Sequence, residues 1–233
     1  MINIRTLASG SSGNAYLIDD GRSQLLLECG ISYKDIQIAL NFDTKNIVGC
    51  LISHEHKDHT KGLKDVVRAG IDCYMSQGTA DAEGIEHHRI KVVENKKQFT
   101  IGTWTILPFD LQHDVAEPFG FLLMNELGKK VLYATDTYYV KYKFNGLTHI
   151  MVEANYAIDL LDHNIEHGIV PQVMKKRLVK SHFSLENVKE FLMANDLSKV
   201  EEIHLIHLSN NNADPERFKR EVQELTGKVV YVS

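Results

Sequence analysis

The densest group of reactive side chains lies in the stretch ISHEHKDHTKG, residues 52–62. His54, His56, Asp58 and His59 fall close together there, and imidazole nitrogens with carboxylate oxygens suit zinc, manganese or iron. The cluster follows the expected end of a strand. In an extended or turning segment His54 and His56 can point the same way and bind one metal ion. Asp58 and His59 come one turn later and are expected to face a second ion.

Four side chains cannot complete two metal sites, so further ligands are expected elsewhere. Three candidates follow apolar, strand-like runs: His113 in DLQHDV, Asp136 in LYATDT and His207 in IHLIHLS. Each has an ordinary alternative, because a histidine at a strand end is often a surface or capping residue and an aspartate there often forms a turn. Since all three occupy strand ends, we expect them to join the first cluster in one constellation.

Strands and helices that must position these residues alternate loosely along the chain. The expected strands are Ile2–Ala8, Ala15–Ile18, Gln24–Glu28, Val48–Ser53, Thr103–Pro108, Phe119–Asn125, Val131–Thr135, Ile150–Glu153, Glu202–His207 and Lys228–Val232. The expected helices are Ile31–Leu40, Thr60–Ala69, Leu185–Asn195 and Pro215–Thr226, with Ser32 and Asp214 as N-caps of the first and the last. This pattern predicts a layered α/β protein with sheets inside and helices outside.

The organisation of the 233 residues is expected to be simple. No repeat, low-complexity segment or long linker interrupts them, which predicts a single domain, 1–233. The least regular part is 156–181, which carries acidic and histidine side chains followed by the basic run KKRLVK. We expect a functional loop or lid-like segment carrying some helix there, and a solvated amphipathic helix is an equal alternative.

Composition sets limits on function and location. With 43% hydrophobic and 24% charged residues the chain is typical of a globular protein, and its net charge of −5 disfavours a grip on a long polyanion. No apolar run is long enough for a membrane span, and the first residues do not resemble a secretory signal. Cys29, Cys50 and Cys73 show no CxxC spacing, so we expect reduced, buried thiols and a cytoplasmic location in a bacterial cell.

The order HxHxDH, His, Asp, His resembles that of the metallo-β-lactamase superfamily, and the likeness runs from LASGSSGN to IHLSNNN. It implies a four-layer αββα sandwich with the site at one edge of the two sheets. It also implies two divalent ions, Zn²⁺ or alternatively Mn²⁺. By this resemblance the first ion is bound by His54, His56, His113 and Asp136, and the second by Asp58, His59, His207 and again Asp136.

One position departs from the family pattern. Glu28 in LLLECG stands where the family usually has an aspartate that supports the first motif from behind the ligands. Because glutamate is one methylene longer, the support must be rearranged, and we expect an altered metal affinity rather than a loss of activity.

Two metal ions can activate water and neutralise charge on a phosphoryl oxygen, with Asp58 orienting the nucleophile. This supports hydrolysis of a phosphodiester, an ester or thioester, or a lactam. Glu153 in HIMVEANYA and His182 in KSHFSLENV resemble the Glu and the HST-motif His of the tRNase Z branch. There the histidine protonates the leaving oxygen and the glutamate orients it. The alternatives are a surface carboxylate for Glu153 and, around His182, simple helix capping by Ser184.

The remaining sequence narrows the substrate. The His182 motif reads HFS where the tRNase Z branch has HST. The lactamase branch is disfavoured because it uses a different third-ligand pattern in secreted proteins. A glyoxalase-type thioesterase shares HxHxDH but gives no role to Glu153 and His182. No inserted tRNA-binding arm is found. The whole pattern resembles two groups, the YycJ/WalJ-like hydrolases, proposed to be DNA exonucleases, and the phage anti-Pycsar phosphodiesterases. A compact acidic chain favours a small substrate over extended nucleic acid.

We therefore expect hydrolysis of cyclic mononucleotides, cCMP and cUMP with cAMP and cGMP as further substrates, to 5′-monophosphates. Such an activity counters a bacterial anti-phage cyclic nucleotide signal. The alternative is a YycJ/WalJ-like nuclease acting on DNA or RNA ends. A non-enzymatic nucleotide binder is disfavoured, because no ligand position is missing.

Substrate contacts are expected from aromatic and basic residues. Tyr138, Tyr139, Tyr142, Phe144 and Tyr156 follow the Asp136 motif, and aromatic faces can stack on any base. Core packing is expected for at least half of them, and Tyr156 is the preferred stacking candidate. In the basic run, Lys175 and Arg177 are expected to contact phosphate or to lie in a dimer interface. The anti-Pycsar resemblance implies a homodimer.

Overall fold

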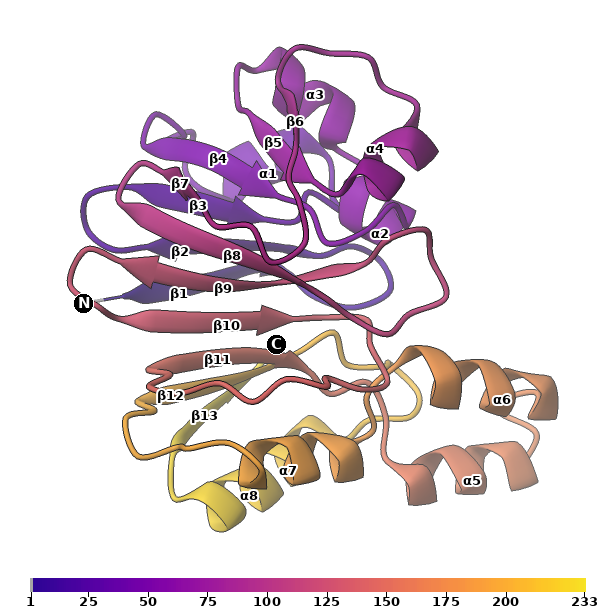
Figure 1. Cartoon of the computed structure of the whole chain (residues 1–233). Helices are drawn as coiled ribbons and strands as arrows, with labels where there is room; N and C mark the ends of the chain where they lie inside the picture. Colours follow the sequence, from indigo (N-terminus) through magenta and orange to yellow (C-terminus); the bar gives the residue numbers. More distant parts are fainter. Residues whose placement is uncertain (1) are drawn as a thin grey trace. The chain divides into compact units, whose positions relative to one another are not determined.

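The computed structural model describes residues 2–233 and resolves the chain into two compact units, each combining sheet and helix (Figure 1). Unit 1 comprises Met1–Asp110 and Val115–Lys129, and unit 2 comprises Leu111–Asp114 and Lys130–Ser233. None of the helices formed by residues 2–233 is long and apolar enough to cross a membrane. The expected single domain remains a prediction.

Unit 1 contains a six-stranded sheet in which the strands follow one another in chain order, β1-β2-β3-β4-β5-β6. Its strands are β1 (Asn3–Ala8), β2 (Ala15–Asp19), β3 (Gln24–Leu27), β4 (Ile47–Leu51), β5 (Cys73–Met75) and β6 (Ile90–Val92). β1, β2 and β3 pair antiparallel, and β3 to β6 pair parallel. In register, Leu27 at the end of β3 faces Leu51 at the end of β4. The residues that follow these two strands therefore leave the same edge of the sheet.

Three further strands of unit 1 form an antiparallel meander. They are β7 (Phe99–Ile101), β8 (Trp104–Asp110) and β9 (Phe119–Asn125). In β8, Trp104, Ile106 and Pro108 lie on the buried side and alternate with half-buried residues, as expected for a strand with one face on a core.

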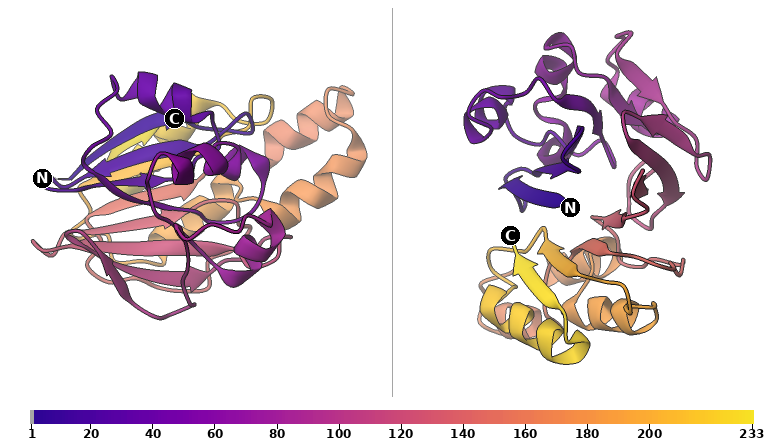
Figure 2. Two further views of the ribbon diagram at one scale, coloured as in Figure 1. Left: turned by 90° about the horizontal axis from the view of Figure 1, so that it is seen from above. Right: turned by 90° about the vertical axis from the view of Figure 1, so that its left-hand side faces the viewer.

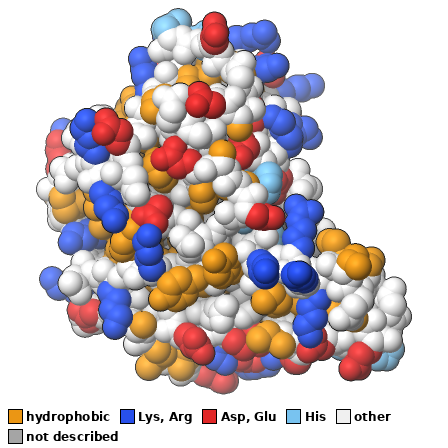
Figure 3. Space-filling view, turned by 45° about the vertical axis from the view of Figure 1, so that its right-hand side comes forward, with side chains coloured by type: hydrophobic (Ala, Val, Ile, Leu, Met, Phe, Trp, Pro, Cys, Tyr) orange, Lys and Arg blue, Asp and Glu red, His pale blue; other side chains and the backbone are white. Residues whose placement is uncertain are grey.

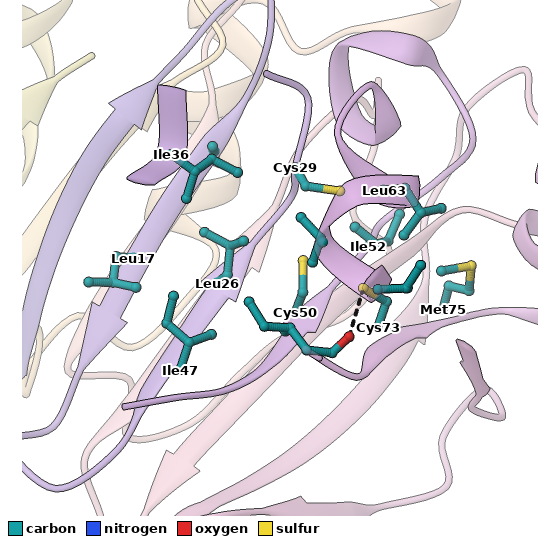
Figure 4. Packing of buried hydrophobic residues seen from close by; sticks show 14 of the residues in the cluster. Leu17, Leu26, Cys29, Ile36, Ile47, Cys50, Ile52, Leu63, Cys73 and Met75 are labelled. Atoms are coloured by element: carbon teal, nitrogen blue, oxygen red, sulfur yellow. Dashed lines mark hydrogen bonds between the residues drawn. The ribbon is translucent and has the colours of Figure 1, made fainter. Parts of the chain in front are cut away.

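Short helices cover the parallel part of the first sheet. They are α1 (Tyr33–Ala39), α2 (Lys57–Thr60), α3 (Leu63–Arg68) and α4 (Gln77–Glu83). α3 packs on β5 and α4 on β6. The core beneath α1 and α3 contains the three cysteines (Figure 4), and all three are buried free thiols, as expected. The Ser32 cap is confirmed, since its side chain accepts a hydrogen bond from the backbone N–H of Asp35.

The expected single helix Thr60–Ala69 is wrong in its start and its continuity. α2 begins three residues earlier, so that Asp58 and His59 are helical, and α3 is a separate helix. The interruption falls at Gly62, whose N–H donates to the carbonyl of Cys29 at 2.7 Å. A Cβ at Gly62 would lie 2.4 Å from the carbonyl oxygen of Ile31, so this close approach requires glycine.

Unit 2 is built on four parallel strands in the order β13-β12-β11-β10. They are β10 (Lys130–Ala134), β11 (His149–Glu153), β12 (Glu202–Ile206) and β13 (Val229–Val232). All five residues of β11 are buried, which is typical of a strand covered on both faces. Glu153 at the end of β11 is in register with Ile206 at the end of β12. The carboxyl ends of these parallel strands thus meet at one edge, the usual place for a ligand site.

Four helices complete unit 2: α5 (Ile158–Glu166), α6 (Gln172–Ser181), α7 (Leu185–Met193) and α8 (Pro215–Thr226). α7 and α8 pack together beside the sheet, whereas α5 and α6 run side by side and project from it (Figures 1 and 2). The Asp214 cap of α8 is confirmed, since its side chain accepts from the N–H of Arg217 at 3.0 Å. Residues 156–181, expected to be either a lid-like segment carrying some helix or an amphipathic helix, are mostly two helices.

Candidate functional site

Three candidate residues follow strands in an unusual backbone conformation. Glu28 comes directly after β3, Asp136 follows β10 and His207 comes directly after β12, with φ angles of 61°, 43° and 55°. Non-glycine residues rarely adopt positive φ, because the Cβ crowds the following carbonyl. Backbone strain of this kind persists where the surroundings fix it, and it concentrates at functional sites.

The histidine cluster of unit 1 is compact. The ring centroids of His54 and His59 lie 4.2 Å apart, and those of His54 and His56 lie 4.8 Å apart. His54 and His59 are buried, while the side chain of Asp58 is 23% exposed. The Oδ2 atom of Asp58 lies 3.5 Å from Nε2 of His59. The four predicted ligands of this stretch therefore converge, although α2 rather than a loop holds the last two.

Two buried residues orient the cluster from behind. Glu28 accepts hydrogen bonds from the N–H of Ser53 at 3.2 Å, and its Oε2 lies 3.5 Å from Nδ1 of His59. The hydroxyl of Ser53 lies 2.9 Å from Nδ1 of His54. In both rings Nδ1 thus faces a protein oxygen, the arrangement by which a second layer of residues directs Nε2 toward a metal. The Glu28 carboxylate thus lies behind the first motif, where the family pattern places its aspartate, and its effect on metal affinity stays a prediction.

The LASGSSGN stretch contributes a residue that sequence reasoning missed. Asn14 is fully buried, its N–H donates to the carbonyl of Asp58 at 2.7 Å, and its Nδ2 lies 3.3 Å from Nε2 of His59. Gly30 closes the same contact, because a Cβ there would lie only 1.7 Å from the carbonyl oxygen of Asp58. The signal in the sequence was a polar run with the residue types of a turn, between the expected strands Ile2–Ala8 and Ala15–Ile18.

In unit 2 the carboxylate of Glu153 organises the site. Its Oε1 lies 2.6 Å from Nδ1 of His182 and 2.8 Å from Nδ1 of His207, and its Oε2 accepts from the N–H groups of Thr137 and Phe183. Asp136 joins the group, with Oδ1 3.2 Å from Nδ1 of His207. Ligand atoms of Asp136, Glu153, His182 and His207 all lie within 4.8 Å of one another.

His113 is held in the same unit by a separate set of contacts. Its Nδ1 donates to the carbonyl of Ser181 at 3.0 Å, and its Nε2 lies 3.9 Å from Oδ2 of Asp136. Ser181 in turn donates from its hydroxyl to Asp114 at 2.7 Å. This contact makes the end of α6 part of the site's support, which the sequence did not indicate.

The protonation behaviour of Glu153 and His182 follows from their pairing. Burial and the nearby charge of Asp136 raise the pKa of Glu153, but the charge of His182 and the hydrogen bonds from His182 and His207 outweigh them and hold it below its ordinary value. Burial lowers the pKa of His182, but the Glu153 carboxylate and, more weakly, Asp136 raise it above the ordinary value overall. A protonated imidazole beside a carboxylate is the form that can donate a proton.

The donor set suits divalent ions. Unit 1 presents three imidazoles and one carboxylate, and unit 2 presents His113, His207 and Asp136. In His113 and in His207, Nδ1 contacts a protein oxygen, so Nε2 is the nitrogen available to a metal. Nitrogen and oxygen donors of this kind fit Zn²⁺ or Mn²⁺.

The residues predicted to contact substrate differ in how exposed they are. Tyr156 is 2% exposed and packs with Leu161 and Val170, which does not favour stacking on a base. Lys175 pairs with Asp162. Arg177 is exposed on α6, which with α5 forms a projecting part that shows basic and apolar side chains side by side (Figure 3). By contrast Tyr139 is 56% exposed.

A family model for the beta-lactamase superfamily domain matches residues 25–208. The chain is therefore a hydrolase of the metallo-β-lactamase fold, with the two-sheet α/β architecture expected from the sequence. It belongs to the beta-lactamase superfamily.

Two curated relatives are nucleases by name. The exodeoxyribonuclease WalJ of Streptococcus pneumoniae is 29% identical over 223 residues, covering 88% of this chain and 81% of the relative. The exodeoxyribonuclease YycJ of Bacillus anthracis is 26% identical over 242 residues, covering 96% and 89%. These names favour the nuclease alternative over the cyclic nucleotide activity that the sequence was expected to encode.

Solved structures of low identity share the fold. The metallo-beta-lactamase fold protein YhfI of Bacillus subtilis superposes with a TM-score of 0.73 at 12% identity, covering 100% of this chain and 96% of that one. A diphosphatase of the PhnP family gives a TM-score of 0.66 at 14% identity, covering 100% and 95%. The short form of human tRNase Z gives 0.63 at 14% identity, covering 100% and 96%.

Proposed function

We propose that this chain is a metal-dependent phosphodiesterase that removes nucleotides from the ends of DNA strands. The observation that carries the proposal is the contact between Glu153 and His182, because it gives an oriented proton donor beside the metal-ligand candidates Asp136 and His207. The names of the two curated relatives support a DNA end as the substrate.

Two divalent ions are proposed to be held by the ligands assigned from the sequence. The first ion would take His54, His56, His113 and Asp136, and the second Asp58, His59, His207 and Asp136. When bound, such ions supply an activated water and neutralise charge on the phosphoryl group. Zn²⁺ is the proposed native metal, with Mn²⁺ as an active substitute.

The chain's own residues supply orientation and a proton. Asp58 is partly exposed and positions the attacking water. His182 is oriented through Nδ1 by Glu153, so its Nε2 is directed outward, and its side chain keeps 17% exposure toward a substrate. Nε2 donates its proton to the oxygen that leaves when the phosphodiester bond breaks.

Cyclic mononucleotides are the second candidate substrate. The net charge of −5 favours them, because a long polyanion needs clustered cations. The bond broken and the roles of Glu153 and His182 are the same for both substrates. A cytoplasmic location and a homodimer belong to the same proposal.

One assay separates the candidates. Purified protein with Mn²⁺ or Zn²⁺ is incubated with end-labelled single- and double-stranded DNA and, in parallel, with cyclic CMP, UMP, AMP and GMP. Release of mononucleotides from strand ends supports the nuclease. Hydrolysis of cyclic nucleotides alone transfers the proposal to the second candidate, and intact substrates in every reaction overturn both.

A further inference from the structure

A cavity of about 290 Å³ lies inside unit 2, between residues 139–143 and helix α7. Four aromatic side chains line it: Tyr139, Tyr142, Phe183 and Phe191. The volume falls near the lower limit of roughly 300–1,000 Å³ at which proteins bind small molecules. Its size therefore suits one nucleotide-sized group.

The aromatic rings that line the cavity differ in their exposure to solvent. Phe183 and Phe191 are buried, with ring centroids 6.2 Å apart, whereas Tyr139 is 56% exposed. A buried ring pair contributes to the core, whereas a tyrosine ring that is 56% exposed beside a cavity leaves much of its surface accessible to a ligand. Such a ring is available to stack on a flat ligand.

The charged side chains that line the cavity are Lys141, Lys143 and Glu190, so lysines outnumber carboxylates by one. Lys141 and Lys143 line it and are exposed, and Nζ of Lys141 lies 5.3 Å from the centroid of the Tyr142 ring. The chain as a whole is acidic, with a net charge of −5, but at this place two lysines lie beside aromatic rings. Aromatic faces with flanking cations are the combination by which proteins bind single-stranded nucleic acid.

Hydrogen bonds hold the chain segment that contains residues 139–143 against α7. The side chain of Asn195 accepts from the N–H of Phe144 at 2.7 Å and donates to the carbonyl of Phe191 at 2.7 Å. The side chain of Asn187 donates to the carbonyl of Tyr138 at 3.5 Å. The cavity is thus formed before any ligand arrives, which reduces the entropy lost on binding.

Hydrogen bonds also connect both sides of the cavity to the carboxylate of Glu153, which orients His182. Phe183 follows His182 in the chain and donates its N–H to Oε2 of Glu153 at 3.2 Å. Thr137 donates its N–H to the same oxygen at 3.0 Å, and its hydroxyl donates to the carbonyl of Tyr139 at 2.9 Å. The cavity and the proton donor are therefore positioned by one group.

We propose that this cavity binds the nucleobase of the nucleotide next to the bond that is cut, with Tyr139 stacking on the base and Lys143 contacting a neighbouring phosphate. The inference rests on the proposed function and adds the part of the substrate that the metal ligands do not recognise. Because an aromatic ring stacks on any base, we expect the cavity to bind all four bases.

Binding tests the inference apart from catalysis. Zn²⁺-loaded protein is titrated by NMR with thymidine 5′-monophosphate and with 2-deoxyribose 5-phosphate, which lacks the base; neither ligand contains a phosphodiester bond to be cut. The wild type is expected to bind the nucleotide more tightly. Tyr139→Ala is expected to lose roughly 5- to 150-fold of that preference, the range for loss of one stacked base. Tyr139→Phe keeps it.

Two further variants guard the result. Ala194→Phe places a ring in the cavity from an exposed position at the end of α7 and is expected to abolish the base preference without removing Tyr139. Tyr231→Ala removes another exposed tyrosine of unit 2, 46% exposed and stacked on His204, and is expected to change nothing. Thermal melting establishes that each variant is folded.

The outcomes separate the two proposals. Equal affinities for the nucleotide and the sugar phosphate in the wild type, or an undiminished preference in both Tyr139→Ala and Ala194→Phe, overturn the inference whatever the enzyme cleaves. Base-dependent binding without cleavage of any phosphodiester retains the inference and rejects the proposed function. With cleavage, KM for a strand ending in a normal nucleotide rises in Tyr139→Ala, and KM for an abasic end does not.

Discussion

The Oε1 atom of Glu153 lies 2.6 Å from Nδ1 of His182, at the end of a fully buried strand. A carboxylate in that position accepts a hydrogen bond from Nδ1–H and thereby keeps the proton on Nδ1 and fixes the direction of the ring. The same oxygen reaches His207 at 2.8 Å, so one carboxylate orients both a proton donor and a candidate metal ligand. Loss of the donor and loss of its support should consequently have different effects.

His182→Ala is expected to retain metal but to lose turnover. General acid catalysis contributes roughly 10²- to 10⁴-fold, so kcat should fall within that range while bound metal, measured by elemental analysis, stays at the wild-type level. An unchanged kcat would remove His182 from the proton-donor role. Loss of metal together with activity would make it a ligand instead.

Glu153→Gln is expected to weaken metal binding as well as turnover. The amide nitrogen of glutamine cannot accept, so it faces either two imidazole N–H groups or the two backbone N–H groups that Glu153 now satisfies. Outer residues of this kind typically change metal affinity by about 10- to 100-fold. Glu224→Gln, which alters an exposed glutamate of α8, is the matched control. Wild-type metal affinity in the Glu153 variant would contradict the orienting role.

That the candidate metal ligands gather could be predicted because most of them follow apolar runs and strand ends of one sheet converge, and their role as ligands stays a prediction. The sequence did not predict how they are held. Asn14 and Ser181 act through contacts between segments far apart in the chain, which no local pattern contains. The polar run before Asn14 has the residue types of a turn, and that property hid its second role.

Burial also distinguishes the aromatic residues that follow Asp136, and their residue types alone could not predict it. Tyr156 and Tyr139 are equivalent as residue types, yet one is 2% exposed and packed on Leu161 while the other is 56% exposed. The short strands β5, β6 and β7, each of three residues, and helix α4 escaped prediction because so few residues establish no periodicity.

Gly30→Ala should destabilise unit 1 more than an ordinary glycine substitution. The added Cβ would lie 1.7 Å from the carbonyl oxygen of Asp58 and 2.7 Å from the backbone nitrogen of Asn14, neither of which can move as a side chain can. We expect a cost at or above the upper end of the roughly 1–3 kcal/mol seen for overpacking. Gly21→Ala has open space but a φ of 87° and should cost only about 1–2 kcal/mol. Equal melting temperatures for the two variants would refute the clash.

Removal of metal is expected to lower thermal stability as well as activity. An ion present at 100 times its dissociation constant stabilises the folded state by about 2.7 kcal/mol. For a chain of this size that corresponds to a fall in Tm of roughly 5–11 °C after EDTA treatment. Calorimetry with and without added Zn²⁺ measures it. A Tm that does not respond to metal, in protein shown to contain it, would exclude the proposed ligand set.

Glu28→Asp tests the departure from the family pattern. The shorter side chain draws its carboxylate back by about one C–C bond, roughly 1.5 Å, from Nδ1 of His59, which it now approaches at 3.5 Å. The φ of 61° at this position suits aspartate better than glutamate, so folding stability should not fall. We therefore expect metal affinity to drop by about tenfold with Tm of the metal-free protein unchanged. Metal titration and melting of the same samples separate these two quantities, and unaltered metal affinity would show that the backbone adjusts to either carboxylate.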